Sequence, residues 1–300
     1  MSSQGSMSMQ YVARLANRSL LRLSGKDVKS FLQNLVTNDL SRQQEGDVVY
    51  AALLTPQGKF LHDFLIIDRG DHVLLDTHAE RAADLARRLT MYKLRSDVIL
   101  EDANTDFCVF ALFGDAVGAS AVPAEAVLQY QDPRLATLGL RVLAPASLTE
   151  DAFTGVHPAS QQDYDAHRLS LGVPEGGSDI QPEKNFLLEA NFEELQGVSF
   201  SKGCYVGQEL TARTKHRAKI RKRFLAFHLD GEIEPGDPIT ANGKEIAVVQ
   251  GFSRPYGIAL TRLKEWHAAC RDDIPLSPEG LVISKPEYVV LPDDLDSEEA

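Results

Sequence analysis

The hydrophobic pattern of the chain changes near residue 220, and this change restricts the possible folds more than any other feature. Before it, helix-like and strand-like segments alternate. After it, short strand-like runs are separated by Gly, Pro and Asn-Gly turns: "KRFLAFHLDG", "PGDPITANGKEIAVVQGFS" and "YGIALTRL". Short strands joined by such turns predict a small all-β unit of the barrel type.

The length of 300 residues also exceeds that of a typical single domain. We expect a flexible tail over residues 1–10, a mixed region over residues 11–219, a barrel over residues 220–290 and an acidic tail over residues 291–300. The mixed region is long enough for two subdomains. The predicted fold class is therefore α+β with a C-terminal β-barrel.

Several elements of the mixed region are predicted by their periodicity. "SGKDVKSFLQNLVTNDL" predicts a helix opened by a capping box of Ser24 and Asp27, and Thr77 with Glu80 predicts a second helix start. "VVYAALLTPQGKFLHDFLIID" predicts a hairpin that turns at residues 56–59. Further strands are predicted for "DVILED", "FCVFALFG" and "LGLRVLAP", and a helix for "DYDAHRLSLGVP". Residues 174–200 lack regular periodicity, yet they are long for a plain loop.

Asp63 is an unusual residue in an apolar run. In "FLHDFLIID" it shares one strand face with Leu61, Leu65 and Ile67, and the opposite face is largely apolar too. We expect this strand to be covered on both sides. A carboxylate buried there is costly unless it has a partner. Two readings stay open: an internal ion pair or backbone partner, or a carboxylate in a ligand pocket that accepts a hydrogen bond or acts as a base.

Cys204 is the second unusual residue, because "FSKGCYVGQELTAR" places it in a polar and flexible setting. Gly203 and Gly207 permit the close approach of a ligand or a partner backbone. If a helix begins two or three residues after the cysteine, its N–H groups favour a thiolate, and Lys202 and Arg213 add positive potential. The alternative is an inert cysteine under a loop.

The segment "RTKHRAKIRKR" is strongly basic in an acidic protein. If it were a strand, Lys215, Arg217, Lys219, Arg221 and Arg223 would lie on one face. That face is either a solvated surface or an anion-binding stripe. It lacks the aromatic residues that stack on nucleic-acid bases.

Two further polar residues are weaker candidates. Arg168 lies on a predicted helix and is able to bind a carboxylate, and Glu189 in "FLLEANFEEL" is able to accept hydrogen bonds from a heterocycle. An arginine or a glutamate in such a setting more often stabilises the fold than binds a ligand. His62, His167 and His216 lack metal-ligand spacing, so no metal site is predicted.

The composition excludes some classes of partner. A net charge of −12 argues against general affinity for nucleic acid or anionic membranes. No apolar run reaches the length of a membrane span, and "MSSQGSMSMQ" does not resemble a targeting segment. The three cysteines, Cys108, Cys204 and Cys270, are widely spaced and indicate a reducing compartment. We expect the cytoplasm, with the mitochondrial matrix as the alternative.

The motif "KGCYVGQELTAR" resembles the signature of YgfZ-type folate-binding proteins. These proteins assist iron–sulfur cluster assembly and repair, and they are relatives of the aminomethyltransferase (T-protein) of the glycine cleavage system. "LSGKDVKSFLQNLVTNDL", "ALLTPQGKFLHDFLI" and "YGIAL" extend the resemblance over nearly the whole chain. It implies an aminomethyltransferase-like folate-binding core followed by a barrel, with tetrahydrofolate as the cofactor. The implied partners are iron–sulfur assembly proteins or client [4Fe-4S] enzymes.

The resemblance also implies roles for particular residues. Asp63 matches the carboxylate beside the reactive folate nitrogens, Glu189 the residue that pairs with the pterin ring, and Cys204 the family's characteristic thiol. The remaining folate-binding residues assigned in this way are Arg168, Lys202, Gly203, Tyr205, Gly207, Gln208 and Arg213. The basic segment would then hold the anionic glutamate tail of folate.

The alternative function is that of a folate-dependent aminomethyltransferase or one-carbon transferase. The cysteine motif, which those enzymes lack, favours the iron–sulfur role. One cysteine cannot hold a [4Fe-4S] cluster, which normally takes four thiolates. A cluster would therefore be shared with a partner or held briefly, and whether a reaction occurs on folate stays open.

Overall fold

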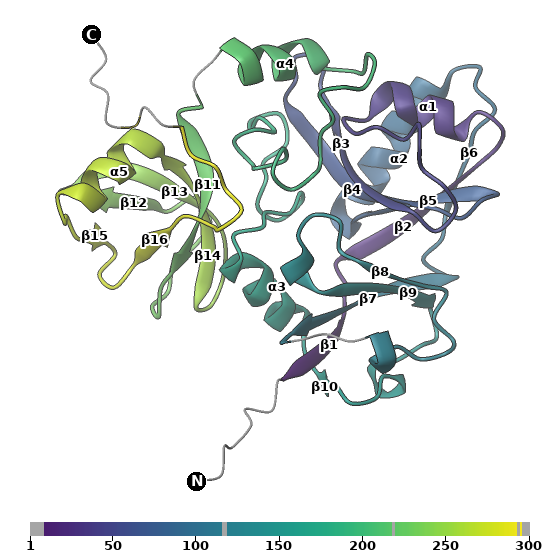
Figure 1. Cartoon of the computed structure of the whole chain (residues 1–300), viewed down its shortest axis with the longest axis horizontal. Coiled ribbons are helices and arrows are strands. Elements are labelled where there is room, and N and C mark those ends of the chain that lie inside the picture. Colours follow the sequence, from purple (N-terminus) through teal and green to yellow (C-terminus); the bar gives the residue numbers. More distant parts are fainter. Residues whose placement is uncertain (1–8, 116–118, 218–219, 293–294, 296–300) are drawn as a thin grey trace.

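The structure is a computed structural model that describes residues 9–115, 119–217, 220–292 and 295. Its strands form three sheets, and Figure 1 shows the C-terminal one beside the other two. The two predicted tails, residues 1–10 and 291–300, lie mostly outside the described residues. Gln10 already belongs to the first strand.

The first sheet carries two helices on one face. Its strands pair in the order β3-β4-β5-β2-β6, and each pair is antiparallel. The apolar residues of the two helices form one hydrophobic cluster with Phe64 and Ile66. The elements are β2 (Arg18–Ser24), α1 (Val28–Leu35), β3 (Val48–Leu54), β4 (Phe60–Asp68), β5 (His72–His78), α2 (Ala79–Lys93) and β6 (Ile99–Asp102). The predicted hairpin at residues 56–59 is confirmed, since β3 and β4 pair across it.

The second sheet has the order β10-β1-β7-β9-β8. Its elements are β1 (Gln10–Arg14), β7 (Phe107–Gly114), β8 (Leu128–Gln131), β9 (Leu140–Pro145) and β10 (His157–Pro158), with short 3-10 helices at Ala119–Ala121, Ala136–Leu138 and Glu150–Ala152. The strands predicted for "DVILED", "FCVFALFG" and "LGLRVLAP" are thus confirmed as β6, β7 and β9. The predicted helix is α3 (Gln161–Ser170), and a capping box of Ser160 and Asp163 begins it.

The third sheet is the predicted barrel. Its order is β15-β12-β13-β14-β11-β16, and it curls into a nearly closed unit (Figure 1). The elements are β11 (Lys222–His228), β12 (Pro238–Ala241), β13 (Lys244–Ser253), β14 (Tyr256–Arg262), α5 (Leu263–Arg271), β15 (Leu276–Ser277) and β16 (Val282–Ser284). α3 packs against β1 and β7 on one side and against β11, β13 and β14 on the other, so it joins the second sheet to the barrel.

Strand β4 is buried along its entire length, as its two apolar faces predict. Phe64 and Ile66 point into the cluster under α1 and α2, whereas Leu65 and Ile67 belong to clusters on the other face. Residues 174–200 contain no assigned helix or strand but contribute Leu187, Phe192 and other residues to the core. This segment is therefore packed interior rather than a surface loop.

Both predicted capping boxes are wrong, because the side chains of Asp27 and Thr77 have tertiary partners. Ser24 ends β2, and Asp27 precedes α1 without a side-chain cap; one of its carboxylate oxygens accepts from the backbone N–H of Asp97 at 2.8 Å. Thr77 lies in β5, where its hydroxyl donates to the backbone carbonyl of Asp63 at 3.0 Å.

In the residues that the structure describes, the basic segment from Arg213 to Arg223 is not one continuous strand. Residues up to 217 belong to α4 (Gln208–Arg217), and β11 begins only at Lys222. Arg223 is buried and pairs with Glu194 at 2.5 Å. Lys219 lies outside the described residues. The segment "QELTARTKHR" is rich in residues with good helix propensity, and this favours a helix over the strand that the alternation suggested.

Candidate functional site

Asp63 lies in β4, which is buried at every position. Its side chain is 3% exposed. One carboxylate oxygen, Oδ2, accepts a hydrogen bond from the Tyr50 hydroxyl at 2.8 Å and one from the Gly176 backbone N–H at 3.2 Å. Burial raises the pKa of Asp63, while Arg18 and these hydrogen bonds oppose the rise. The carboxyl group is therefore poised to hold or accept a proton more readily than an exposed one.

A network of buried ion pairs surrounds this carboxylate. Arg18 pairs with Asp76 at 2.6 Å and with Glu175 at 2.7 Å, and Arg141 pairs with Asp76 at 3.0 Å and with Asp132 at 2.8 Å. Burial alone would raise the pKa of Glu175, but Arg18 and the neighbouring arginines hold it at about 2. The network joins the first sheet, the second sheet and the segment around residue 175. It therefore fixes the surroundings of Asp63.

Gly176 brings the backbone directly onto the Asp63 carboxylate. A Cβ atom added at Gly176 would overlap the second carboxylate oxygen, Oδ1, and would lie 2.6 Å from Cζ of Phe60. The next residue, Gly177, has a φ of +95°, and a Cβ there would overlap the His78 ring. Glycine is thus required at two successive positions for the turn to approach Asp63 so closely.

Glu189 is the second carboxylate that the sequence analysis singled out. One of its oxygens accepts from the Phe186 backbone N–H at 2.9 Å, and burial raises its pKa. The segment that carries it is attached to the start of β4, since the Phe60 N–H donates to the Asn185 carbonyl at 3.0 Å. Lys59 covers the Phe186 ring at 3.3 Å from its centroid.

Aromatic rings line the core next to Asp63. Tyr50 stacks on Phe192 at 5.0 Å between centroids, and Phe60 lies 6.0 Å from Phe192. Tyr205 of the cysteine motif belongs to the same hydrophobic cluster. This cluster connects the motif with the tyrosine whose hydroxyl binds Asp63.

The thiol of Cys204 is free and exposed, as its polar setting predicts. The residues on either side of it are buried: Lys202 is 7% exposed and Tyr205 is 7% exposed. Between them, a Cβ at Gly203 would meet no atom within 4 Å, so this part of the loop faces open space. The loop thus presents a single thiol between two buried anchors.

The helix at the end of the motif begins at Gln208, one or two residues later than the expected start. Gly207 has a φ of +81°, and a Cβ added to it would lie 2.5 Å from the carbonyl oxygen of Thr55. The start of α4 therefore packs on the turn between β3 and β4, and Figure 1 shows α4 between the barrel and the first sheet. Arg213 is exposed on this helix.

The structure places the other predicted residues differently. Lys202 directs its ammonium group to backbone carbonyls instead of the thiol. Arg168 is buried, and its guanidinium binds Asp179 at 2.5 Å, Asp165 at 3.1 Å and the Val173 carbonyl at 3.0 Å. Its donors are thus directed at the protein itself.

Sequence reasoning did not identify Tyr50, Gly176 or the Arg18–Glu175 pair as neighbours of Asp63. The Gly-Gly pair at residues 176–177 was a visible signal for a close backbone approach. Tyr50 lies on the strand that pairs with β4, opposite Leu65. Such a pairing register depends on the folded hairpin and cannot be read from the tyrosine alone.

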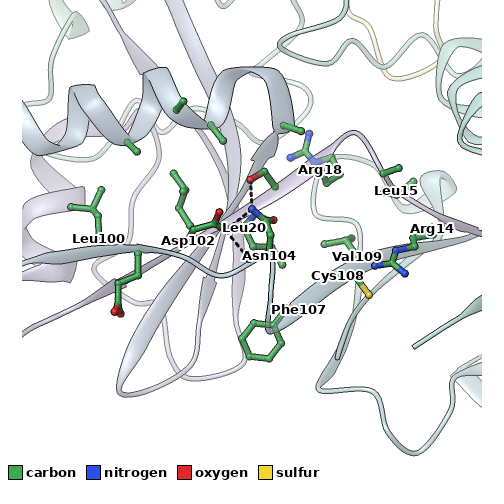
Figure 2. Close-up of a pocket in the computed structure, with 18 residues that line it drawn as sticks. Arg14, Leu15, Arg18, Leu20, Leu100, Asp102, Asn104, Phe107, Cys108 and Val109 are labelled. Carbon is green, nitrogen blue, oxygen red and sulfur yellow. Dashed lines mark hydrogen bonds between the residues drawn. The ribbon is translucent and has the colours of Figure 1, made fainter. Parts of the chain in front are cut away.

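A cavity of about 750 Å³ lies apart from both Asp63 and Cys204. It is bounded by α2, β2, β6 and the start of β7, and Figure 2 shows Arg14, Asn104 and Cys108 among the residues that line it. The Cys108 thiol donates to the Pro145 carbonyl at 3.3 Å, and burial raises its pKa. It is thus less reactive than an exposed thiol.

Two structural tests bear on membrane and metal binding. In the part of the chain that the structure describes, none of the helices has the length and apolarity needed to cross a membrane. Among the same residues, no group of three or more His, Cys, Asp or Glu side chains is arranged to hold a metal ion.

Two family models match the chain. The GCVT N-terminal domain matches residues 15–124, and the CAF17 C-terminal beta-barrel domain matches residues 221–286. A similar solved structure is the glycine cleavage system aminomethyltransferase T from Bartonella henselae, with 16% identity and a TM-score of 0.64 over 85% of this chain and 79% of that chain. The predicted fold class, an aminomethyltransferase-like core with a C-terminal β-barrel, is therefore confirmed.

Several proteins are similar to most of this chain and share the name IBA57. The iron-sulfur cluster assembly factor IBA57, mitochondrial, is 34% identical in Homo sapiens, over 82% of this chain and 76% of that protein, and 33% identical in Mus musculus, over 83% and 76%. The homolog from Mycosarcoma maydis is 34% identical over 75% of this chain, which spans 59% of that protein's length. The comparisons thus support a family related to the YgfZ-type proteins and do not specifically show the YgfZ type itself. The chain belongs to the IBA57 family of iron–sulfur cluster assembly factors.

Proposed function

We propose that this chain is a tetrahydrofolate-binding protein that assists the assembly or repair of iron–sulfur clusters in client proteins, with Cys204 as its reactive thiol. The observation that carries the proposal is the position of this thiol: it is exposed, whereas Lys202 and Tyr205 beside it are buried. The names of the relatives support the iron–sulfur role. Because one thiolate cannot complete a cluster, the partner supplies the other ligands.

The residues around Asp63 fit a reduced folate in their chemistry. Asp63 is a buried carboxylate and Glu189 a half-buried one; both have raised pKa values, and each is able to accept a hydrogen bond from a ring nitrogen. Tyr50, Phe60 and Phe192 supply flat apolar surfaces for a planar ring. The backbone of the turn at Gly176 fills the space next to the carboxylate, and Gly176 adds no side chain there. Binding of folate at Asp63 would therefore require this turn to move, although the Arg18–Glu175 ion pair holds the residue before it.

The relatives are named as mitochondrial proteins. Of the two locations expected from the sequence, the mitochondrial matrix is therefore the one we propose, in place of the cytoplasm. The proposed partners are iron–sulfur assembly proteins or client [4Fe-4S] enzymes.

The second candidate function is folate-dependent aminomethyl or one-carbon transfer. It is favoured by the match of the GCVT N-terminal domain to residues 15–124. The two functions differ in their dependence on Cys204. A transferase that acts on folate through Asp63 has no need of an exposed thiol, whereas an assembly factor that contacts a shared cluster does.

The test replaces Cys204 with Ser in cells that lack their own copy of the protein, and the activities of [4Fe-4S] enzymes are measured. Cys270→Ser is the matched control, because Cys270 is also a free and exposed cysteine. We expect client activities to fall with Cys204→Ser and to stay normal with Cys270→Ser. Normal activities with Cys204→Ser, in a protein that accumulates to the usual level, would overturn the assignment of Cys204.

A further inference from the structure

The ammonium group of Lys202 occupies the end of helix α1. The last carbonyls of a helix have no partner within the helix. Lys202 Nζ donates to the Gln33 carbonyl at 2.8 Å, to the Val36 carbonyl at 2.6 Å and to the Asn38 carbonyl at 2.7 Å. An ammonium group has three donors, so all of them are used. A positive charge at a helix C-terminus is also favoured by the helix dipole.

The segment that precedes Lys202 is attached to the same turn. The Thr37 hydroxyl donates to the Gly197 carbonyl at 2.6 Å and accepts from the Ala52 N–H at 2.8 Å. The Ser199 N–H donates to the Thr37 carbonyl at 3.0 Å. The chain therefore reaches Lys202 along a path that α1 and β3 already fix.

On the other side of the cysteine, Tyr205 inserts into the aromatic cluster, and Gly207 packs on the turn after β3. Lys202 and Tyr205 thus hold the loop from two sides, and the Lys202 ammonium lies 5.2 Å from the centre of the Tyr205 ring. The segment between them, Gly203 and Cys204, is exposed. Without the Lys202 anchor, the fixed points nearest to this segment would be Ser199 on one side and Tyr205 on the other.

We propose that Lys202 is a positioning residue for Cys204, which uses the carbonyls at the end of α1 to hold the thiol in one exposed orientation. This inference rests on the proposed function, because it assigns to Lys202 the presentation of the thiol to a partner-bound cluster. The motif suggests instead that Lys202 adds positive potential at the thiol. The ammonium group, however, donates its hydrogen bonds to three backbone carbonyls.

The test measures the motion of residue 204 directly. Cys108→Ser and Cys270→Ser leave Cys204 as the single thiol of the chain, and a nitroxide spin label is attached to it. Lys202→Met keeps the length and the apolar stem of the side chain but removes its three donors. Lys215→Met is the matched control, because Lys215 lies on the neighbouring helix α4 and pairs with Glu193.

We expect the rotational correlation time of the label to shorten severalfold in Lys202→Met and to stay unchanged in Lys215→Met. A purely structural role of Lys202 would lower the unfolding temperature without changing the motion of the label in the folded protein, and this result would overturn the proposal. If Lys202→Met does not fold, the motion of the label is measured in Lys202→Arg instead. A planar guanidinium cannot direct three donors from one atom, so the label should again move faster.

Client enzyme activity separates the two proposals. If the label moves faster in Lys202→Met and client activities fall as they do in Cys204→Ser, both proposals are supported. If the label moves faster but Cys204→Ser leaves client activities normal, Lys202 positions the thiol and the function proposed for Cys204 is wrong.

Discussion

The hydrogen bond between Tyr50 and Asp63 leads to a prediction that depends on pH. Replacing Tyr50 with Phe removes the hydroxyl that donates to the carboxylate at 2.8 Å and leaves the ring stack on Phe192 in place. The folded-state pKa of Asp63 lies above its ordinary value. The stability that Asp63 contributes is therefore fully present at low pH and is lost as the pH rises through the folded pKa. The Tyr50 hydroxyl limits this loss, because it lowers the pKa of Asp63.

The free-energy cost of Tyr50→Phe depends on whether the Asp63 carboxyl group is charged. A hydrogen bond between neutral groups contributes about 1 kcal/mol, and one to a charged group contributes about 1.5–3 kcal/mol. Tyr50→Phe should therefore cost less free energy of unfolding at pH 4 than at pH 7, since the cost approaches about 1 kcal/mol as Asp63 becomes protonated and about 1.5–3 kcal/mol as it ionises.

Urea denaturation of the native protein and the variant at both pH values measures this difference. Tyr288→Phe is the control, since the Tyr288 hydroxyl is part-buried and donates to the Gly172 carbonyl at 2.6 Å, a neutral acceptor. Its cost should be the same at both pH values. An equal cost of Tyr50→Phe at pH 4 and pH 7 would refute the reasoning that the charge of Asp63 sets the strength of this hydrogen bond.

Two further predictions concern stability and the loop. Burial lowers the pKa of His62 to about 4, so the unfolded chain binds more protons than the folded one between pH 4 and 6.5, and stability falls as the pH decreases through this range. The native protein should lose about 2 kcal/mol more than His62→Gln between pH 7 and pH 5 in urea denaturation, and equal losses would contradict this. Gly207→Ala places a Cβ in a left-handed conformation and 2.5 Å from the Thr55 carbonyl, so we expect a loss of about 1–3 kcal/mol. Gly243→Ala, which also has a positive φ but meets no atom within 4 Å, controls for the backbone conformation alone, and an equal loss in both variants would contradict the packing argument.

The sequence predicted those parts of the fold that depend on local patterns. The barrel, the hairpin before Asp63 and the burial of β4 on both faces follow from hydrophobic spacing and turn residues. The position of Asp63 in a largely apolar strand was enough to select it, because a buried carboxylate requires a partner. The identity of that partner was not predictable, because Tyr50 and Gly176 meet Asp63 through a strand pairing and a turn distant in sequence.

The incorrect predictions for Lys202 and Thr77 have a common physical cause. Lys202 was expected to act on the thiol because it is two residues away, but a long side chain follows its best acceptors, and these are carbonyls more than 160 residues earlier in the chain. Thr77 was expected to cap a helix, but its hydroxyl binds the neighbouring strand. In both cases a tertiary hydrogen bond competes with the local one and prevails.

The measurement that tests the central claim most directly is calorimetric titration of the native protein and Asp63→Asn with tetrahydrofolate. Asn keeps the shape of the side chain and an acceptor for the Tyr50 hydroxyl, but it removes the charge. We predict saturable binding at one site in the native protein and an affinity about 10–100-fold lower in Asp63→Asn, as expected for the loss of one hydrogen bond to a charged group. Cys204→Ser should bind as tightly as the native protein. Folded native protein that does not bind tetrahydrofolate, or an Asp63→Asn variant with unchanged affinity, would contradict the account.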